Sequence, residues 1–509
     1  MTPPLSLSGR NLTLEDVESV ARGERHDIEL APSARESVQA SRAVVDRVLS
    51  EGRTVYGVNT GFGALSDIVI PADDLADLQA NLLRSHAAGV GEPLSAEATR
   101  AILLLRANTL AAGASGVRPA VIEGLLDLLA HDILPRIPRF GSVGASGDLA
   151  PLAHVALALL GEGDVRAGDG WEPAAEALRR AGLRTLAPAA KEGLALINGT
   201  QVHTAIGVLA LLAAERAVDA CDVTGALSLD ALRGTPDAFD PAIQEARPHP
   251  GQALSAARLR GLLEGSEIRE SHRSGDPRVQ DAYSLRCMPQ VHGASRQLLG
   301  YVREVLSVEI NSVTDNPLVF ARDGRVLSGG NFHGQIVAQA LDLIAIACAD
   351  LGAIAERRIA RLVDPSMSGL PAFLTPAPGV RSGLMIVQIG AAALVAEMRR
   401  LAVPASVDSI PTDNNKEDHV SMGVGAALKA EQAVALLETV LGMELLAACQ
   451  ALDFLEPLRT GAVAERARSE LREVVPRLED DRVLAPDLDA AAALVREGTL
   501  ADLARGIAL

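Results

Sequence analysis

The chain has 509 residues, of which 48% are hydrophobic and only 2% aromatic, so small aliphatic side chains must fill a large core. The formal net charge of −18 excludes a nucleic-acid-binding protein, because such a protein needs a basic face for the phosphates. Four widely spaced cysteines without a CxxC pair, and an N-terminus without a basic and apolar leader, favour a cytoplasmic protein without a disulfide framework.

The first part of the chain predicts short helices separated by a glycine-rich loop. Thr13 is a typical N-cap, since acidic residues follow it in the first turn. Residues 55–65, VYGVNTGFGAL, contain three glycines and one asparagine, so we expect an exposed loop that could serve as a lid. The helices expected around this loop cover residues 13–22, 34–50, 73–88 and 95–113.

Residues 137–148, IPRFGSVGASGD, predict a tight irregular turn in front of an apolar helix. The turn has neither GxGxxG nor GK[ST], which argues against a nucleotide-binding loop. It also lacks GxSxG, which argues against a serine hydrolase. Taken alone, the segment is best interpreted as the start of a helix that Ser146 and Asp148 cap.

Long helical patterns dominate the chain from about residue 196 onwards. Several are apolar nearly all round, which indicates burial within a bundle and between subunits. The longest apolar run, 336–355, is interrupted by Asp342 and Asp350, so we expect a buried helix and no membrane span. The long helices are expected at 200–218, 289–311, 333–363, 383–402 and 423–452, followed by short helices in 456–509.

A few polar residues stand outside the packed helical patterns. Of the three tyrosines, Tyr56 lies in the lid-like loop and Tyr283 in the polar stretch VQDAYSLRC, so both are candidates for function rather than for core packing. The ten histidines show no HExxH or paired ligand spacing, so we expect no metal site. His86 and His419 are the histidines whose surroundings favour a functional role.

Nine segments, in order along the chain, match the motifs of one known family. They are YGVNTGFG (56–63), SHAAGVGEPL (85–94), GSVGASGDLAPLAH (141–154), ALINGTQ (195–201), VQDAYSLRC (279–287), NSVTDNP (311–317), GGNFHGQ (329–335), SGLM (382–385) and PASVDSIPT with EDHVSMG (404–423). With these segments the chain resembles the aromatic amino-acid lyase family and, within it, members that act on histidine. A lone Ala-Ser-Gly would be weak evidence, whereas nine ordered blocks identify the family.

The resemblance implies a mainly α fold with a long central helical bundle of the aromatic ammonia-lyase and fumarase-like type. It implies an N-terminal domain, 1–195, that carries the lid loop and the cofactor-forming loop, and a C-terminal domain, 196–509, with the long-helix bundle and peripheral helices. It also implies a homotetramer whose active sites are shared between subunits.

The family cofactor is methylidene-imidazolone (MIO), which forms autocatalytically from Ala145, Ser146 and Gly147 with loss of two waters. Glycine suits the third position because the backbone must fold back on itself. MIO supplies the electrophile that ordinary side chains lack for expelling ammonia from an amino acid. We expect no metal or nucleotide cofactor.

The resemblance also assigns roles to individual side chains. Tyr56 is the base that takes the β-proton, so we expect its surroundings to lower its pKa from about 10. Arg286 binds the substrate carboxylate as a bidentate fork, with help from Asn198. The remaining catalytic residues are Gln280 and Tyr283, which line the MIO, Phe332, which packs beside it, and Glu417, which meets the amine or the distal end of the substrate.

The pair Ser85-His86 is typical of histidine-specific relatives, and His86 with Glu417 suits a buried imidazole that needs hydrogen-bond partners. Met385 adds apolar contact to the substrate. The resemblance therefore implies elimination of ammonia from L-histidine to give trans-urocanate, the first step of histidine degradation. The segment before HVSMG departs from the usual SANQED, because Lys416 replaces a glutamine and could pair with Glu417.

Three further departures are Met288, His203 and His292, which stand where other residue types are usual. Together with Lys416 they leave open a second hypothesis, an MIO-dependent lyase or 2,3-aminomutase acting on another aromatic or related amino acid. A third hypothesis is a non-catalytic helical oligomer that kept the scaffold. The presence of Tyr56, Ser146 and Arg286 argues against it.

Overall fold

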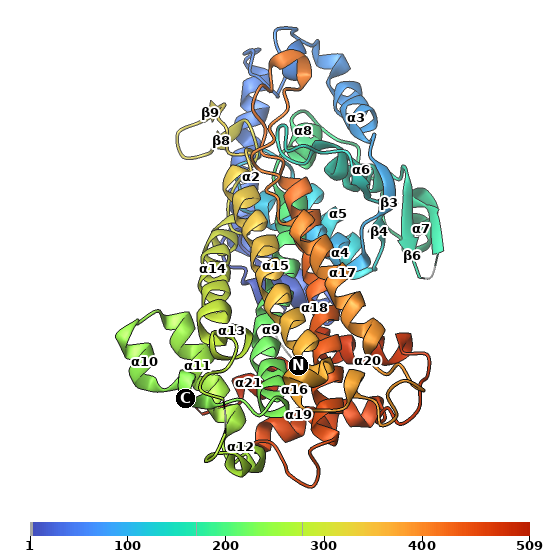
Figure 1. The fold of residues 1–509 in the computed structure, drawn as a ribbon. Helices are drawn as coiled ribbons and strands as arrows, with labels where there is room; N and C mark the ends of the chain where they lie inside the picture. The colour runs from blue at the N-terminus through green and yellow to red at the C-terminus, as the bar shows by residue number, and fades with distance from the viewer. Residues whose placement is uncertain (1–3, 169, 277, 509) are drawn as a thin grey trace. The chain divides into compact units, whose positions relative to one another are not determined.

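The computed structural model describes residues 4–168, 170–276 and 278–508, and its regular structure is mostly helical (Figure 1). The predicted mainly α fold is therefore confirmed. Contacts divide the chain into two compact units, of which unit 1 comprises 1–209, 304–341 and 404–428, and unit 2 comprises 210–303, 342–403 and 429–509. The division that we expect at residue 195 stays a prediction.

Unit 1 contains the four helices predicted for the first part of the chain, each within two residues at either end. Thr13 caps the first of them as predicted, because its hydroxyl accepts the Asp16 N–H at 3.0 Å and the Asp16 carboxylate accepts the Thr13 N–H at 3.1 Å. The helices of unit 1 are α1 (Leu14–Ala21), α2 (Pro32–Ser50), α3 (Leu75–His86), α4 (Ala96–Ala111), α5 (Pro119–Ala130), α6 (Leu149–Leu159), α7 (Ala174–Arg180) and α8 (Glu192–Ile197), with the short 3₁₀ turns η1 (Gly63–Leu65), η2 (Ala72–Asp74) and η5 (Asp413–Asn415).

Short strands brace the loops of unit 1, and the helical periodicity of the sequence did not predict them. They form a parallel pair, β1 (Leu5–Leu7) with β2 (Ile28–Leu30), and two antiparallel pairs, β3 (Val90–Pro93) with β5 (Pro138–Phe140) and β8 (Leu318–Phe320) with β9 (Arg325–Leu327). A three-stranded sheet has the order β4 (Leu134–Pro135), β6 (Asp164–Ala167), β7 (Gly170–Pro173).

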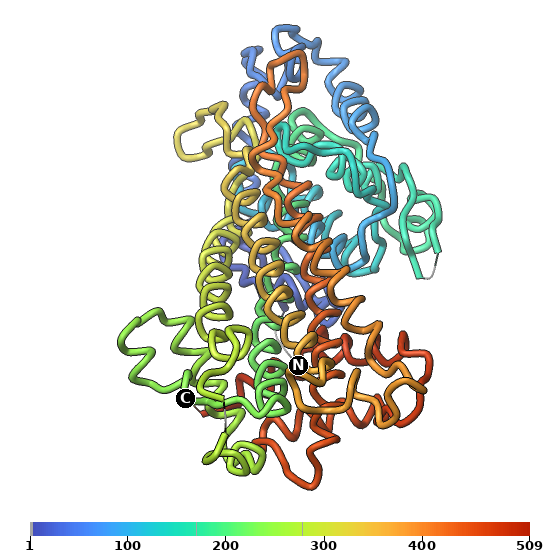
Figure 2. Tube along the Cα trace, in the orientation of Figure 1, coloured from blue at the N-terminus to red at the C-terminus, as the bar shows by residue number. Residues whose placement is uncertain are grey.

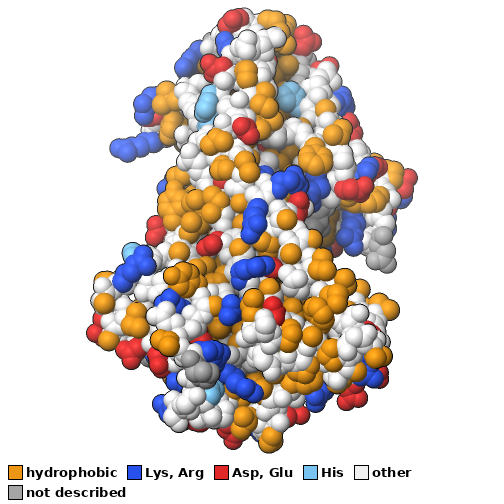
Figure 3. Space-filling view, viewed as in Figure 1, with side chains coloured by type: hydrophobic (Ala, Val, Ile, Leu, Met, Phe, Trp, Pro, Cys, Tyr) orange, Lys and Arg blue, Asp and Glu red, His pale blue; other side chains and the backbone are white. Residues whose placement is uncertain are grey.

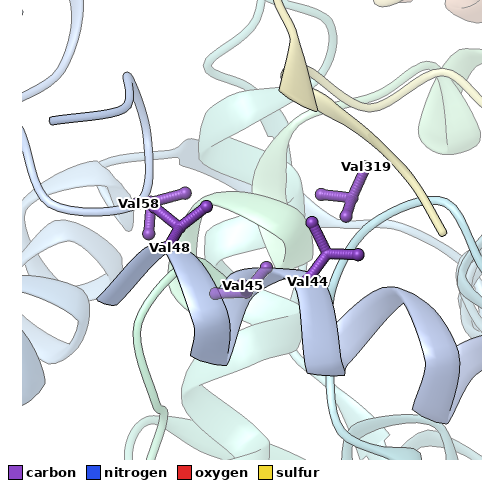
Figure 4. Close-up of a cluster of buried hydrophobic side chains, with 5 residues drawn as sticks. All are labelled: Val44, Val45, Val48, Val58 and Val319. Carbon is purple, nitrogen blue, oxygen red and sulfur yellow. The ribbon is translucent and has the colours of Figure 1, made fainter. Parts of the chain in front are cut away.

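A cluster of five buried valines fixes the base of the lid-like loop. Val44, Val45 and Val48 project from α2 and meet Val58, in the loop, and Val319, in β8 (Figure 4). The cluster contains no aromatic side chain, as the composition led us to expect. Burial of each valine stabilises the fold by about 1.5–3 kcal/mol, so the loop is firmly attached two residues after Tyr56.

The five long helices predicted for the second part of the chain are all present (Figure 2). The boundary between the units crosses four of them. These four are α9 (Gln201–Ala231), α14 (Met288–Glu309), α15 (Gln335–Val363) and α18 (Gly423–Asp453). Unit 2 also contains α10 (Pro241–Ala246), α11 (Pro250–Leu263), α12 (Glu267–Ser271), α13 (Tyr283–Arg286), α16 (Pro365–Ser368), α17 (Met385–Leu401), α19 (Ala462–Val474), α20 (Ala485–Arg496), α21 (Thr499–Arg505), η3 (Pro236–Phe239) and η4 (Ala372–Leu374).

Buried polar side chains join the long helices within unit 2. Glu444 of α18 is fully buried, and its carboxylate accepts hydrogen bonds from Arg358 of α15, at 2.9 Å, and from Thr224 and Ser228 of α9, at 2.8 and 2.7 Å. Every carboxylate oxygen therefore has a partner, which is the condition under which a buried charge is tolerated. These contacts specify how α9, α15 and α18 pack in the predicted bundle.

Two of the long helices, Gln335–Val363 and Gly423–Asp453, are long and apolar enough to cross a membrane. Their most apolar windows are 67% and 78% buried inside the protein, as in the core helices of a helical bundle. On the molecular face drawn in Figure 3, basic and acidic side chains are interspersed and do not form one basic surface.

Candidate active site

A cavity of about 930 Å³ in unit 1 brings together segments that lie far apart in the sequence. Its walls come from the lid-like loop, from the C-terminal turn of α3, from the Ala-Ser-Gly turn, from the end of α8 and from residues 328–333 and 413–420. Seven predicted site residues line it, namely Tyr56, His86, Ala145, Ser146, Asn198, Phe332 and Glu417. The structure therefore gathers these residues into one site.

The turn formed by Ala145, Ser146 and Gly147 is folded back tightly. Ser146 has a φ of +52° and Gly147 one of +82°, conformations that are costly for residues with a side chain. Gly147 forms a parallel bridge with Gly199, and a Cβ atom at residue 147 would lie 2.6 Å from the Gly199 carbonyl carbon. Only glycine fits at position 147, and the turn is held against Gly199.

The interpretation of Ser146 and Asp148 as caps of α6 is wrong. Asp148 precedes α6, but its side chain makes no hydrogen bond that caps this helix. Its backbone N–H donates to the Gly199 carbonyl at 2.7 Å. Its carboxylate instead accepts the N–H groups of Val202 and His203 at the start of α9, at 2.9 and 3.0 Å. The residue thus attaches the turn to α9, a helix distant in sequence.

Ser146 contacts the predicted substrate-binding carboxylate directly. Its hydroxyl donates to Glu417 Oε1 at 2.8 Å, and the Thr412 hydroxyl donates to Glu417 Oε2 at 2.8 Å. Among the ion pairs of the described residues, none joins Lys416 to Glu417, although both line the cavity. The pairing that we considered from the sequence is therefore not made, because two neighbouring hydroxyls already satisfy the carboxylate.

Tyr56 lies half-buried at the start of the lid-like loop. Burial raises the pKa of Tyr56, a backbone hydrogen bond with Gly63 partly opposes that change, and the carboxylates of Glu417 and Asp413 raise the pKa further. The expectation that the surroundings lower this pKa is therefore wrong for the chain by itself. Asp413 also accepts the Ala64 N–H at 3.0 Å, so it ties the loop to the wall opposite.

Asn198 is fixed from two sides. Its amide nitrogen donates to the Asn316 carbonyl at 2.9 Å, while Arg106 of α4 donates to the backbone carbonyls of Asn198, at 3.1 Å, and Ala195. Arg106 is fully buried, and its burial lowers its pKa to about 10. Arg106 was not predicted as a site residue, because the sequence around a single arginine in an apolar helix does not indicate which groups it contacts.

His86 lies at the end of α3, where its Nδ1 is 2.8 Å from the Leu82 carbonyl and 3.1 Å from the Ser85 hydroxyl. A carbonyl oxygen only accepts, so Nδ1 carries the proton and Nε2 of the neutral ring is left as an acceptor. Two other lining residues, His333 and His419, have parallel stacked rings whose centres are 5.9 Å apart. His419 was a candidate from the sequence, whereas His333 was missed.

Four predicted site residues, Gln280, Tyr283, Arg286 and Met385, belong to unit 2 and do not line this cavity. The ring of Tyr283 is largely exposed, and the Arg286 guanidinium lies over it, 4.7 Å from the ring centre. Exposed polar and aromatic groups of this kind are available to a neighbouring molecule.

The departures at Met288 and His292 have structural explanations inside unit 2. Met288 of α14 is buried against Gly225 of α9. A Cβ atom on Gly225 would lie 2.5 Å from the Met288 sulfur, so the glycine leaves room for the methionine. His292 is buried and pairs with Asp222 at 2.8 Å. Neither side chain lines the cavity.

No group of three or more His, Cys, Asp or Glu side chains in the described part of the chain could hold a metal ion. The turn at Ala145, Ser146 and Gly147, in contrast, fits an MIO precursor. Its glycine cannot be replaced by a residue with a side chain, its serine hydroxyl has one partner in the cavity, and its backbone already folds back.

Comparisons with known proteins show the family of the chain. The sequence profile of the aromatic amino acid lyase family, which is MIO-dependent, matches residues 12–473. The chain is 54% identical to histidine ammonia-lyase from Anaeromyxobacter sp. (strain K), over 97% of this chain and 99% of that protein. It is 51% identical to histidine ammonia-lyase from Myxococcus xanthus, over 98% of each.

Solved structures show the same fold. Histidine ammonia-lyase from Trypanosoma cruzi superposes with a TM-score of 0.92 at 43% identity, covering 100% of this chain and 96% of that one. Tyrosine aminomutase from Streptomyces globisporus superposes with a TM-score of 0.94 at 37% identity, covering 99% of both chains. The mainly helical fold is thus shared by lyases and aminomutases.

Proposed function

The chain belongs to the aromatic amino acid lyase family, and from this membership we propose that it is a histidine ammonia-lyase. It eliminates ammonia from L-histidine without oxidation and releases trans-urocanate, the first step of histidine degradation. The observation that carries the proposal is one cavity in which Ser85, His86 and Glu417 face the turn of Ala145 and Ser146.

Ala145, Ser146 and Gly147 form the MIO cofactor of this enzyme. The cofactor supplies an electrophile that captures the substrate and so divides a difficult elimination into easier steps. Its formation removes the Ser146 hydroxyl, which in the unmodified chain donates to Glu417 Oε1. That oxygen of Glu417 then becomes an acceptor for the substrate amine or for its distal N–H.

Tyr56 takes the β-proton of the substrate. Because burial and two carboxylates oppose its ionisation, the phenolate needs a positive charge nearby. We place Arg286 there, from a neighbouring subunit of a cytoplasmic homotetramer, since Arg286 does not line the cavity of its own chain. Its fork binds the substrate carboxylate, and Gln280 and Tyr283 of the same segment complete the wall around the MIO.

The choice of histidine rests on His86. Its Nδ1–H is occupied by the Leu82 carbonyl, so Nε2 accepts the imidazole N–H of the substrate. A phenyl or phenol ring offers no N–H to this acceptor, which would stay unpaired and disfavour those substrates. Asn198 assists at the substrate carboxylate, Phe332 restricts the ring, and Met385 adds apolar contact from a neighbouring subunit.

A second candidate is a 2,3-aminomutase, which the likeness to tyrosine aminomutase and the cationic Lys416 in the cavity wall favour. A panel of L-histidine, L-tyrosine and L-phenylalanine with identification of the products separates the two. The proposal predicts an alkene, urocanate, from L-histidine and little product from the others. A β-amino acid as the main product would overturn it.

Intact mass tests the cofactor independently of the substrate. The mature chain should be lighter than its sequence mass by two waters. A full-length unmodified mass in a folded preparation would instead support a non-catalytic helical scaffold.

A further inference from the structure

A buried ion pair lies directly behind the cofactor-forming turn. His203 Nδ1 is 2.9 Å from Asp148 Oδ1, and both side chains are completely shielded from solvent. Asp148 follows Gly147 in the chain, and its other carboxylate oxygen accepts the N–H groups of Val202 and His203. The Asp148 carboxylate therefore connects the turn to α9, and among the described residues its ion pair is with His203.

The imidazole of His203 packs closely against two glycines. A Cβ atom on Gly334 would lie 2.6 Å from His203 Cε1, and a Cβ atom on Gly423 would lie 2.9 Å from His203 Nδ1. Gly334 comes directly after the lining residues Phe332 and His333. Gly423 comes directly after Met422, whose N–H donates to the Val143 carbonyl at 2.8 Å. The ring therefore contacts two segments that are adjacent in sequence to the site and to the cofactor-forming turn.

The pair has a consequence for the reaction that builds the cofactor. Gly147 must approach the Ala145 carbonyl, and its contacts with Gly144, Ser142 and Gly199 hold it within the turn. Asp148, the next residue, attaches the turn to α9, and His203 holds its Oδ1 oxygen. Without the imidazole, that buried oxygen would keep only the Ser142 hydroxyl at 3.4 Å, so the carboxylate would draw in water or turn and the turn would loosen. Burial opposes the charged form of His203, but Asp148 and Glu309 raise its pKa, which agrees with a charged partner.

We propose that His203 is a positioning residue for cofactor formation: through Asp148 it holds Gly147 where its amide nitrogen reaches the Ala145 carbonyl carbon. This inference rests on the proposed function. In the step itself a bond forms between Gly147 N and Ala145 C, and the Ala145 oxygen leaves as water with the amide protons of Ser146 and Gly147. The Ser146 hydroxyl and α-hydrogen then leave together as a second water. Both steps are dehydrations, so no oxidant is needed.

The test follows the intact mass of newly synthesised full-length protein with time, using only chain that elutes as folded protein. His203→Leu keeps the bulk but removes the partner of Asp148. It should mature roughly 100-fold more slowly than the unaltered chain, the order of loss that misplacing reacting groups by 1 Å causes. His203→Asn places an amide N–H where Nδ1 was, so it should restore most of the rate.

The control is His292→Leu, which removes a histidine that is equally buried and also paired with a carboxylate, Asp222 at 2.8 Å, but belongs to unit 2. It should lose thermal stability like His203→Leu and still mature at the normal rate. Equal slowing in both leucine variants, or normal maturation of His203→Leu, would overturn the positioning role. If the unaltered chain never loses two waters, the proposed function itself fails.

Discussion

Replacing Gly147 by alanine adds one methyl group where the cofactor-forming turn touches Gly199. A φ of +82° costs an L-residue about 1–2 kcal/mol. The new Cβ atom would lie 2.6 Å from the Gly199 carbonyl carbon, so the backbone must move, and such overpacking costs about 1–3 kcal/mol. The two effects together disfavour the native turn by about 2–5 kcal/mol, which lowers its population roughly 30- to 4,000-fold.

The assay compares the intact mass of Gly147→Ala with urocanate formation from L-histidine. We expect Gly147→Ala to keep the unmodified mass and to lose activity by at least the factor by which the population of the native turn falls. Gly182→Ala is the control, because Gly182 has a similar φ of +72° but no heavy atom of the described chain within 4 Å of its Cβ position. That variant should mature fully. A Gly147→Ala chain that loses two waters at the normal rate would refute the reasoning.

Three further predictions concern other parts of the molecule. Asp413→Asn removes one of the carboxylates that raise the pKa of Tyr56, so the limb of kcat/KM that rises with pH should move to lower pH; movement to higher pH would contradict the electrostatics. His86→Leu should lower kcat/KM for L-histidine roughly 5- to 150-fold, which corresponds to the loss of one hydrogen bond of about 1–3 kcal/mol. An unchanged kcat/KM would show that His86 does not take part in substrate recognition. Arg358→Met leaves Glu444 buried without its cation and should cost about 3–5 kcal/mol of unfolding free energy in chemical denaturation, part of which Glu444→Gln should restore; a neutral effect would show that the pair is not structural.

The long helices were predictable from apolar faces that repeat with helical spacing, whereas the shorter α5 was not predicted. The predicted bounds differ most at α9, which we expected to end at 218 and which continues to Ala231. Its second half contains Asp222, Thr224 and Ser228, which interrupt the apolar pattern. Their partners, His292 and Glu444, come from distant helices, so only the folded chain shows that these polar groups are buried and satisfied.

Seven residues that the sequence blocks predicted for the site line the cavity, whereas the electrostatics around them were not predictable from the sequence. The surroundings of Tyr56 raise its pKa because burial and the carboxylates of Glu417 and Asp413 act together, and Asp413 is distant in sequence. His203 stood out only as an unusual residue for its position. Its contact with Asp148 spans 55 residues, and no local pattern contains it.

The central claim is that this chain converts L-histidine into urocanate with a cofactor made from its own Ala145, Ser146 and Gly147. The most direct measurement follows urocanate absorbance after L-histidine is added to protein whose intact mass is already two waters short. The account predicts steady formation of urocanate with one ammonia released for each molecule. Protein of that mass that produces no urocanate from L-histidine would contradict it.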